Sequence, residues 1–350
     1  MKLILPNLKQ APKTTFFLKL ADANGILQHS RFSSPEQVMG YSLDDNARGL
    51  IVAAWHYKLY RQKTFYDLIG KILNFIEETQ IDDGRFHNYL WRSYGQSFFS
   101  HELAEDSFGE TVWALGFLRS LGYTKNLDGK IDKIFNRCLP RILEFTGLRT
   151  KAYSLAGLCY YLRTGENLQV RKRATELAGR LIKQYQENRT ADWRWFENIL
   201  TYANAILPYS LFIAAKILGD RSLLKVASES FRFLIKVSTI NNIPAPIGQR
   251  GWYAKRGNRA IYDQQPIEAG YLVLASLAAG EITGNKYYSG LAWEWFTWFH
   301  GKNLAGLSLI DKKDGGCYDG LEPWKVNLNK GAESSICYLL AYLALADNEK

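Results

Sequence analysis

The chain has few of the residues that build metal sites or disulfide frameworks. Its 350 residues include only four cysteines, which lie far apart and show no CxxC or Cys/His ligand spacing. Neither a zinc site nor a disulfide framework is therefore predicted, and no metal or other cofactor is expected. Buried, reduced thiols are the simplest interpretation. The cysteines are Cys138, Cys159, Cys317 and Cys337.

Long apolar runs are also missing. No segment approaches the roughly 18 residues that a membrane-spanning helix needs, and residues 1–10 lack the uninterrupted apolar core of a signal peptide. We therefore expect a cytoplasmic protein without a membrane partner. No stretch rich in proline, glycine or serine divides the chain, so we predict a single domain over residues 1–350, with residues 1–40 as an irregular entry segment.

The formal net charge of +10 raises the question of an anionic partner. Much of the surplus lies at residues 125–141 and 171–183, on segments predicted to be outward-facing helices. No aromatic residues interleave with these bases in the manner of a nucleic-acid motif. A solvated outer surface explains the charge, and nucleic acid is not expected as a partner.

A repeated pattern organises the chain. Each copy begins with a polar head, acidic in five of the six copies and basic in the other, and continues as a helix of small and aliphatic residues. The six copies lie at residues 40–54, 105–114, 149–157, 197–205, 263–270 and 333–341. They begin about 58 residues apart on average, which is regular enough to count as an internal repeat. The pattern predicts six helices that start polar and become buried.

An amphipathic helix follows each of the first five buried helices. Residues 43–59 are almost all apolar or small, which suits an inner helix, whereas residues 65–79 alternate apolar and charged positions, which suits an outer one. Inner helices are predicted at 43–59, 105–121, 150–163, 198–217, 267–283 and 331–346. Outer helices are predicted at 65–79, 128–145, 167–187, 221–237 and 287–299.

Six such hairpins predict an all-α fold, the (α/α)6 barrel. A closed repeat architecture also allows 350 residues to form one domain, although ordinary single cores stop growing at about 250–300 residues. The alternative is an open helical solenoid. The stop at six hairpins and the absence of polar capping repeats favour the barrel.

Predicted outer-to-inner connections are long, at roughly 10–30 residues, whereas inner-to-outer turns are short. Long loops on a rigid scaffold commonly carry function, and these loops open on the face where the polar heads begin. That rim therefore collects acids and aromatic residues. Sugars present apolar ring faces that stack on aromatic rings, and their hydroxyls pair with planar polar groups, so the composition is typical of a carbohydrate-binding surface.

Glycoside hydrolysis needs two carboxyl groups, one protonated and one ionised. Asp45 and Asp106 occupy equivalent positions on adjacent inner helices, so we predict them as the catalytic pair. The remaining rim residues are predicted to bind substrate in one bowl at the helix N-termini. They are Asp44, Arg48, Glu110, Trp193, Trp195, Glu197, Arg250, Trp252, Tyr253, Asp263, Gln264, Glu268, Glu322, Trp324 and Glu333.

Each acid also has a structural interpretation. An acid in the first turn of a helix often caps free N–H groups and complements the helix dipole. Arg48 has the same alternative, because it could pair with Asp44 or Asp45 and fix the start of its helix instead of meeting a ligand.

Four motifs carry a family resemblance: GYSLDDNAR at residues 40–48, EDSFG at 105–109, DQQPIEA at 263–269 and NLNKGAES at 327–334. Together they resemble a poorly characterised bacterial family of six-hairpin-glycosidase-like proteins, sometimes fused to or encoded beside glycosyltransferases. The resemblance spans nearly the whole chain. It implies an (α/α)6 fold, a carbohydrate context and a possible glycosyltransferase partner, and it assigns no reaction.

Three functions follow as hypotheses. The first is an intracellular glycoside hydrolase acting on an oligosaccharide, and the second is a non-catalytic carbohydrate-binding module that serves a glycosyltransferase. The third is a sugar epimerase or isomerase, because some (α/α)6 barrels use histidines as proton-transfer bases. None of the five histidines starts a predicted inner helix, which disfavours the third. They are His29, His56, His87, His101 and His300.

Overall fold

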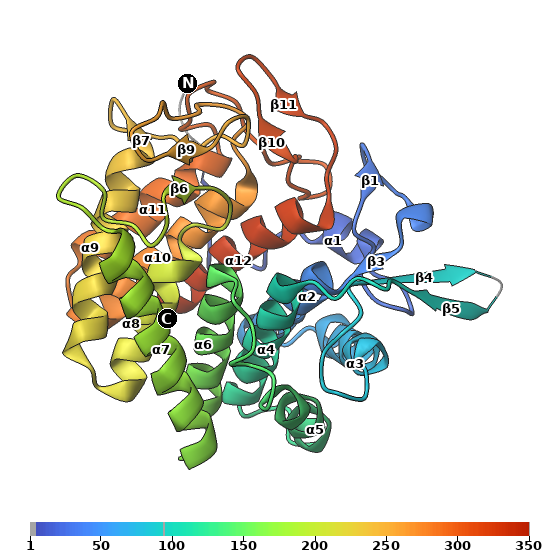
Figure 1. Ribbon diagram of the computed structural model, residues 1–350. Helices are drawn as coiled ribbons and strands as arrows, with labels where there is room; N and C mark the ends of the chain where they lie inside the picture. Colours follow the sequence, from blue (N-terminus) through green and yellow to red (C-terminus); the bar gives the residue numbers. More distant parts are fainter. Residues whose placement is uncertain (1–4, 94, 350) are drawn as a thin grey trace. The chain divides into compact units, whose positions relative to one another are not determined.

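The computed structural model describes residues 5–93 and 95–349, and within these ranges it contains twelve α-helices (Figure 1). Packing divides the chain into two compact units. One unit comprises residues 18–179, and the other comprises residues up to 17 together with residues from 180 onward. No helix in the described ranges is long and apolar enough to cross a bilayer.

The predicted alternation of buried and amphipathic helices is confirmed. The buried helices are α2 (Leu43–Tyr60), α4 (Glu105–Ser120), α6 (Leu148–Leu162), α8 (Ile206–Leu218), α10 (Pro266–Thr283) and α12 (Ala332–Asn348). The amphipathic helices are α3 (Lys63–Thr79), α5 (Asp128–Cys138), α7 (Leu168–Asn188) and α9 (Arg221–Val237), and the outer position before α12 is filled by the aromatic-rich α11 (Tyr287–Phe299). The entry segment contains one further short helix, α1 (Thr15–Leu20).

Two helix boundaries differ from the prediction. Helix α5 ends at Cys138 and not at 145, because Pro140 has no N–H to continue the helical hydrogen bonds, and the Arg141 N–H donates to the Cys138 carbonyl only three residues back (2.9 Å). Helix α8 begins at Ile206 and not at 198, because the Asn204 side chain accepts from the Thr201 N–H (3.2 Å) and donates to the Thr201 carbonyl (2.7 Å). Such local side-chain bonds compete with helix formation. Glu197 therefore lies in a loop.

The strands are short and lie in the long connections and the entry segment, as Figure 1 shows. In the first unit, β1 (Ser30–Arg31) pairs with β2 (Ser34–Pro35), and β3 (Tyr41–Ser42), β4 (Tyr89–Ser93) and β5 (Gln96–Phe99) form an antiparallel sheet. A 3-10 turn, η1, covers Gln37–Met39. In the second unit, β6 (Ile199–Leu200) pairs with β9 (Tyr253–Ala254), β7 (Thr239–Ile240) with β8 (Ile243–Pro244), and β10 (Gly320–Leu321) with β11 (Val326–Asn327).

Helices α4 and α6 approach each other at backbone level through three glycines. A Cβ atom added at Gly109 would lie 2.8 Å from the carbonyl oxygen of Thr150. A Cβ at Gly116 would overlap the carbonyl of Gly157, and one at Gly157 would overlap the carbonyl of Val112. This close approach brings polar side chains of α6 against α4.

Replacement of Gly157 by Ala is expected to destabilise the protein by about 1–3 kcal/mol, because the added methyl group must push two packed helix backbones apart. The control is Gly179→Ala in α7, where no atom lies within 4 Å of the new Cβ. That change should instead raise stability by about 0.5–1 kcal/mol through helix propensity. Urea unfolding measures both, and equal effects would contradict the close approach.

His56 is fully buried on α2, and its ring stacks on Phe65 of α3 with 3.6 Å between centroids. Burial lowers the pKa of His56 from 6.5 to about 4. The unfolded chain therefore binds more protons than the folded chain between these two pH values. Folding stability should fall as pH decreases through this window.

The contribution of His56 to this loss is expected to reach about 3 kcal/mol near pH 4. The His56→Leu variant should lose less stability than the wild type between pH 7 and pH 4, whereas His101→Gln, at an exposed position, should follow the wild type. Urea unfolding at several pH values measures the slopes. Parallel slopes for wild type and His56→Leu would contradict the buried, neutral ring.

In the second unit, the long connection between α11 and α12 is held by a buried lysine. The Lys330 ammonium group pairs with Asp311 (2.9 Å) and Asp314 (2.6 Å), and it lies 4.7 Å from the ring centre of Phe16. Burial alone would lower the pKa of Lys330, but the hydrogen bonds to the two carboxylates raise it. This connection is therefore anchored at its base.

Candidate functional site

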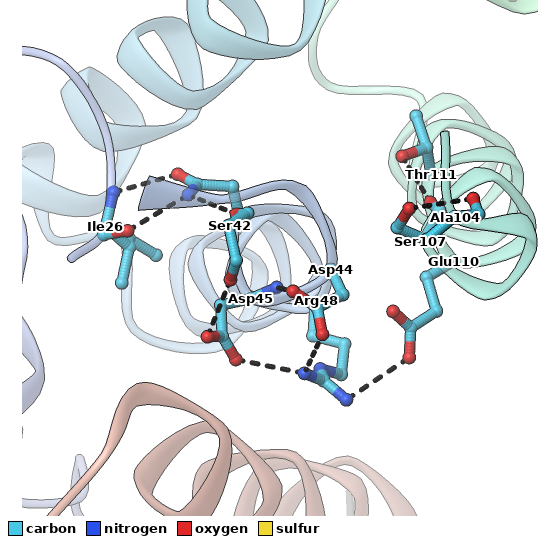
Figure 2. A network of polar contacts seen from close by, with 10 residues as sticks. Ile26, Ser42, Asp44, Asp45, Arg48, Ala104, Ser107, Glu110 and Thr111 are labelled. Atoms are coloured by element: carbon cyan, nitrogen blue, oxygen red, sulfur yellow. Dashed lines mark hydrogen bonds and ion pairs between the residues drawn. The ribbon is translucent and has the colours of Figure 1, made fainter. Parts of the chain in front are cut away.

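The first unit carries a compact group of charged side chains at the N-terminal ends of α2 and α4. Figure 2 shows Arg48 reaching from α2 toward α4. Its guanidinium group pairs with Asp44 (3.2 Å) and Asp45 (2.9 Å) on its own helix and with Glu110 of α4 (3.2 Å). Arg48 is 2% exposed, so its role in the described structure is to hold three carboxyl groups together. We call Asp44, Asp45, Arg48, Asp106 and Glu110 the carboxyl cluster.

Asp45, predicted as a catalytic acid, is buried and held at both oxygens. One oxygen faces Arg48, and the other accepts from the Ser42 hydroxyl at 2.8 Å. Ser42 is the residue before α2 and belongs to β3, so the start of the helix itself positions Asp45. Arg48 pairs with both acids of its own first turn, which is the contact that its structural interpretation expects.

Glu110 is the most deeply placed acid of the cluster, at 3% exposure. Burial raises the pKa of Glu110 well above its usual value, and the charges of Asp44 and Asp106 raise it further. Arg48 and a hydrogen bond from Tyr153 act in the opposite direction but do not outweigh burial. A neutral carboxyl group can still accept from Arg48 through its carbonyl oxygen, so this ion-pair geometry fits a protonated Glu110.

Asp106 lies one helical turn before Glu110 on α4 and is half-buried. Residues four apart share a helix face, so the two carboxyl groups are neighbours. The Thr150 hydroxyl of α6 donates to Asp106 at 2.7 Å. The adjacent Glu105 has a different role, because it accepts from the backbone N–H groups of Thr146 (3.2 Å) and Gly147 (2.8 Å) and fixes the start of α6.

The carboxyl cluster contains four acids and one arginine. Asp45 and Glu110 are buried, and ionised carboxylates in such surroundings would repel each other strongly, because little water is present there to screen them. A proton on Glu110 relieves that repulsion. The cluster can therefore hold a protonated carboxylic acid next to an accessible carboxylate, which is the combination that acid–base chemistry needs.

Three residues that support the carboxyl cluster were not among the sequence predictions: Ser42, Thr150 and Tyr153. Ser42 stands directly before the acidic head, in the position of a helix N-cap, and that signal could have identified it. Thr150 and Tyr153 belong to the repeat copy that begins with a base. No sequence feature indicates that their side chains reach α4, because the close approach of α4 and α6 depends on tertiary packing.

The predicted aromatic residues of the second unit fall into two groups. Trp193 and Trp195 are 3% and 0% exposed, so neither offers an open ring face to a sugar, contrary to their predicted role. Trp193 donates to the Glu197 carbonyl at 2.7 Å and packs edge-on against Tyr253. Trp252 is half-buried, and Tyr253 is half-buried as well. These loop aromatics mainly form a small core.

The predicted polar residues of the second unit also divide. Gln264 is fully buried and accepts from the Trp298 indole at 2.8 Å, and the buried Glu268 accepts from Asn204 at 2.9 Å. Gln264 therefore joins the loop before α10 to α11, and Glu268 joins α10 to the loop before α8. Glu333 is half-buried in the first turn of α12.

Asp263, Arg250 and Glu322 form a more accessible group in this unit. Arg250 and Glu322 lie 3.8 Å apart. Burial raises the pKa of Asp263, Arg250 lowers it, and Glu322 and Asp319 raise it further. These side chains are close enough to influence one another, and they lie on loops, as predicted.

Among residues 5–93 and 95–349, no group of three or more histidine, cysteine, aspartate or glutamate side chains has the arrangement of a metal site. The four cysteines are buried thiols. Two of the four histidines of the first unit are engaged elsewhere: His56 is in the core, and His87 Nδ1 lies 2.7 Å from the Ser100 carbonyl.

No family model matches the sequence, and a comparison with curated proteins found no match either. Solved structures do match. A D-mannose isomerase aligns with a TM-score of 0.74 at 13% identity, covering 96% of this chain and 95% of its own. The cellobiose 2-epimerase from Bacillus thermoamylovorans aligns with a TM-score of 0.71 at 12% identity, covering 97% of this chain and 96% of its own. The GH76 α-mannanase from Bacteroides thetaiotaomicron aligns with a TM-score of 0.65 at 9% identity, covering 96% of this chain and 93% of its own.

At these identities the likeness establishes the fold alone. The chain is mostly helical and has the (α/α)6 fold over almost its full length, as the sequence predicted. This fold serves sugar isomerases, sugar epimerases and glycoside hydrolases among the matching structures.

Proposed function

We propose that the protein is a glycoside hydrolase whose catalytic carboxyl pair is Asp106 and Glu110. The observation that carries the proposal is the raised pKa of Glu110, which burial and neighbouring carboxylates cause, beside the more accessible Asp106. The pair differs from the Asp45–Asp106 pair predicted from the repeat. Asp45 is held by Arg48 and Ser42, which suits a positioning role.

In this mechanism Glu110, which is 3% exposed, donates its proton to the glycosidic oxygen as the bond to the leaving group breaks, so substrate binding must open access to its carboxyl group. Asp106 acts on the anomeric carbon, either directly as a nucleophile or through a water molecule. Arg48 offsets the negative charge that Glu110 acquires when it loses its proton, and Thr150 keeps the Asp106 carboxylate oriented. Glu110 can therefore pair with Arg48 both before and after it loses its proton, and Asp106 keeps its hydrogen bond from Thr150.

The stereochemical outcome distinguishes the two roles open to Asp106. Retaining enzymes hold their carboxyl groups about 5–5.5 Å apart, and the second carboxylate is the nucleophile; inverting enzymes hold them about 6.5–9.5 Å apart, and the second carboxylate activates water. Proton NMR of the first product formed reads the anomeric configuration and so decides between them.

The test is incubation of the purified protein with a panel of neutral aryl glycosides and oligosaccharides, followed by detection of released sugar. Release from at least one substrate, lost in Glu110→Gln, is the expected result. Binding of an oligosaccharide without release would favour the second hypothesis, a non-catalytic module that serves a glycosyltransferase. In that case the Asp106→Asn variant should bind sugar as tightly as the wild-type protein does.

The structural neighbours give a specific reason to test a second activity. The isomerase and the epimerase have TM-scores of 0.74 and 0.71, above the 0.65 of the α-mannanase. Isomerisation or epimerisation next to a sugar carbonyl exchanges a carbon-bound hydrogen with solvent. Incubation of the protein with free reducing sugars in deuterium oxide detects this exchange. Deuterium uptake that is lost in Asp106→Asn would show that the carboxyl cluster catalyses proton transfer at carbon and not hydrolysis.

A further inference from the structure

Trp324 is exposed to an unusual degree. Its side chain is 92% exposed, whereas the other nine tryptophans of the chain are buried or half-buried. An indole ring is among the largest apolar groups a protein can bury, and leaving it in water gives the fold no packing energy. The position therefore requires an explanation other than stability.

The indole stands on a well-anchored hairpin. Trp324 lies in the connection between β10 and β11, where the Glu322 N–H donates to the Lys325 carbonyl at 2.9 Å. At the base of the hairpin, the backbones of Leu321 and Gln264 exchange two hydrogen bonds of 2.8 and 3.0 Å. Gln264 is itself buried and bonded to Trp298. Figure 1 shows this hairpin, in red, extending away from α12.

Two charged residues, Glu322 and Lys325, lie within two positions of Trp324 on the same hairpin, and Arg250 lies near Glu322. The Glu322 carboxylate lies 3.8 Å from Arg250 and 3.4 Å from Lys325. The two basic side chains remain mostly exposed, at 65% and 72%, so they can donate to a ligand while Glu322 accepts from it. Arginine is particularly suited to this, because its fork can bind two adjacent oxygens.

We infer that Trp324, Arg250 and Glu322 form a carbohydrate-binding subsite for a neutral oligosaccharide. The indole stacks on the apolar face of one pyranose ring, and the charged groups pair with the hydroxyls at the edge of that ring. The two bases together with Glu322 and the nearby Asp263 give little net charge, which favours a neutral sugar over an anionic one. The inference requires binding only and does not depend on hydrolysis.

Acrylamide quenching of tryptophan fluorescence tests the subsite in the full chain. Trp324 should supply most of the quenchable emission, because it is the most exposed tryptophan. We expect at least one of cellohexaose, mannohexaose and maltohexaose to protect it from quenching. Protection by none of the three would overturn the inference, as would protection by phosphatidylcholine–phosphatidylglycerol vesicles and not by sugar.

Variants separate stacking from general damage. By isothermal titration calorimetry, Trp324→Ala should weaken binding of the protecting hexaose by about tenfold, whereas Trp324→Phe, which keeps an aromatic face, should restore most of it. The control is Tyr287→Ala, which removes another exposed aromatic side chain, 60% exposed, in the same unit. An equal loss in Tyr287→Ala, or no loss in Trp324→Ala, would contradict the subsite. Binding with no turnover would reject the hydrolase proposal and leave this inference intact.

Discussion

Asp106→Asn is expected to lower kcat for glycoside hydrolysis by about 10²–10⁴-fold, the range for loss of a positioned catalytic acid or base. The amide keeps the size of the side chain and can still accept from Thr150 through its oxygen, so the fold should survive. KM should change little, since the loss lies in the chemical step. Steady-state kinetics and thermal unfolding together separate chemistry from stability.

The matched control is Glu105→Gln, which alters the neighbouring acid of the same helix turn. Its amide oxygen can still accept from the backbone N–H groups of Thr146 and Gly147, so α6 should begin as before. This variant should keep nearly the wild-type kcat. A similar loss in both variants would show that hydrolysis depends on the shape of this helix start and not on the Asp106 carboxylate.

Arg48→Met is expected to destabilise the folded protein by about 3–5 kcal/mol at neutral pH. The variant leaves the carboxyl groups of Asp44 and Asp45 without their shared cation, and an uncompensated charge on the buried Asp45 is costly. Urea unfolding measures the free energy. The destabilisation should shrink as pH falls, because protonation removes the negative charges that Arg48 balances.

A double-mutant cycle makes this prediction specific. Asp45→Asn removes one of the charges, so the double variant with Arg48→Met should lose less stability than the two single losses added together. The comparison is Lys63→Met, whose ion pair with Asp67 is exposed and should contribute nothing measurable. Strict additivity of Asp45→Asn and Arg48→Met would contradict the shared network.

The repeat in the sequence was enough to predict the fold, because each inner helix carries its own signal. A polar head followed by small and aliphatic residues marks a helix that is buried after its first turn, and most helix boundaries were predicted to within a few residues. Of the two exceptions, α5 and α8, the second shows the limit. There a local hydrogen bond of Asn204 replaced the first turn, and side-chain geometry of this kind is not visible in a periodic pattern.

The candidate site was predicted less completely than the fold. The acidic heads placed Asp44, Asp45, Asp106 and Glu110 among the acids of one rim, but indicated neither that these four form a cluster nor which of them is most deeply buried. That distinction depends on α6 packing against α4, and therefore on contacts between residues about 40 apart in the sequence. Assignment of catalytic roles to Asp106 and Glu110 stays a prediction.

The aromatic residues show a second limit. Composition placed Trp193, Trp195 and Trp324 in the same class, as loop tryptophans near acids. Two of them are core residues of their unit, and only Trp324 is open to solvent. Burial of a loop tryptophan depends on whether another loop covers it, as Tyr253 covers Trp193, and no local pattern reports that.

The proposed mechanism requires Glu110 to carry a proton at neutral pH, and infrared spectroscopy can detect that proton directly. In wild-type protein at pH 7, we expect a C=O stretching band of a protonated carboxylic acid that is absent from Glu110→Gln and retained in Asp45→Asn. A spectrum at pH 7 without that band, or with a band that survives in Glu110→Gln, would contradict the proposed acid and the hydrolysis mechanism built on it.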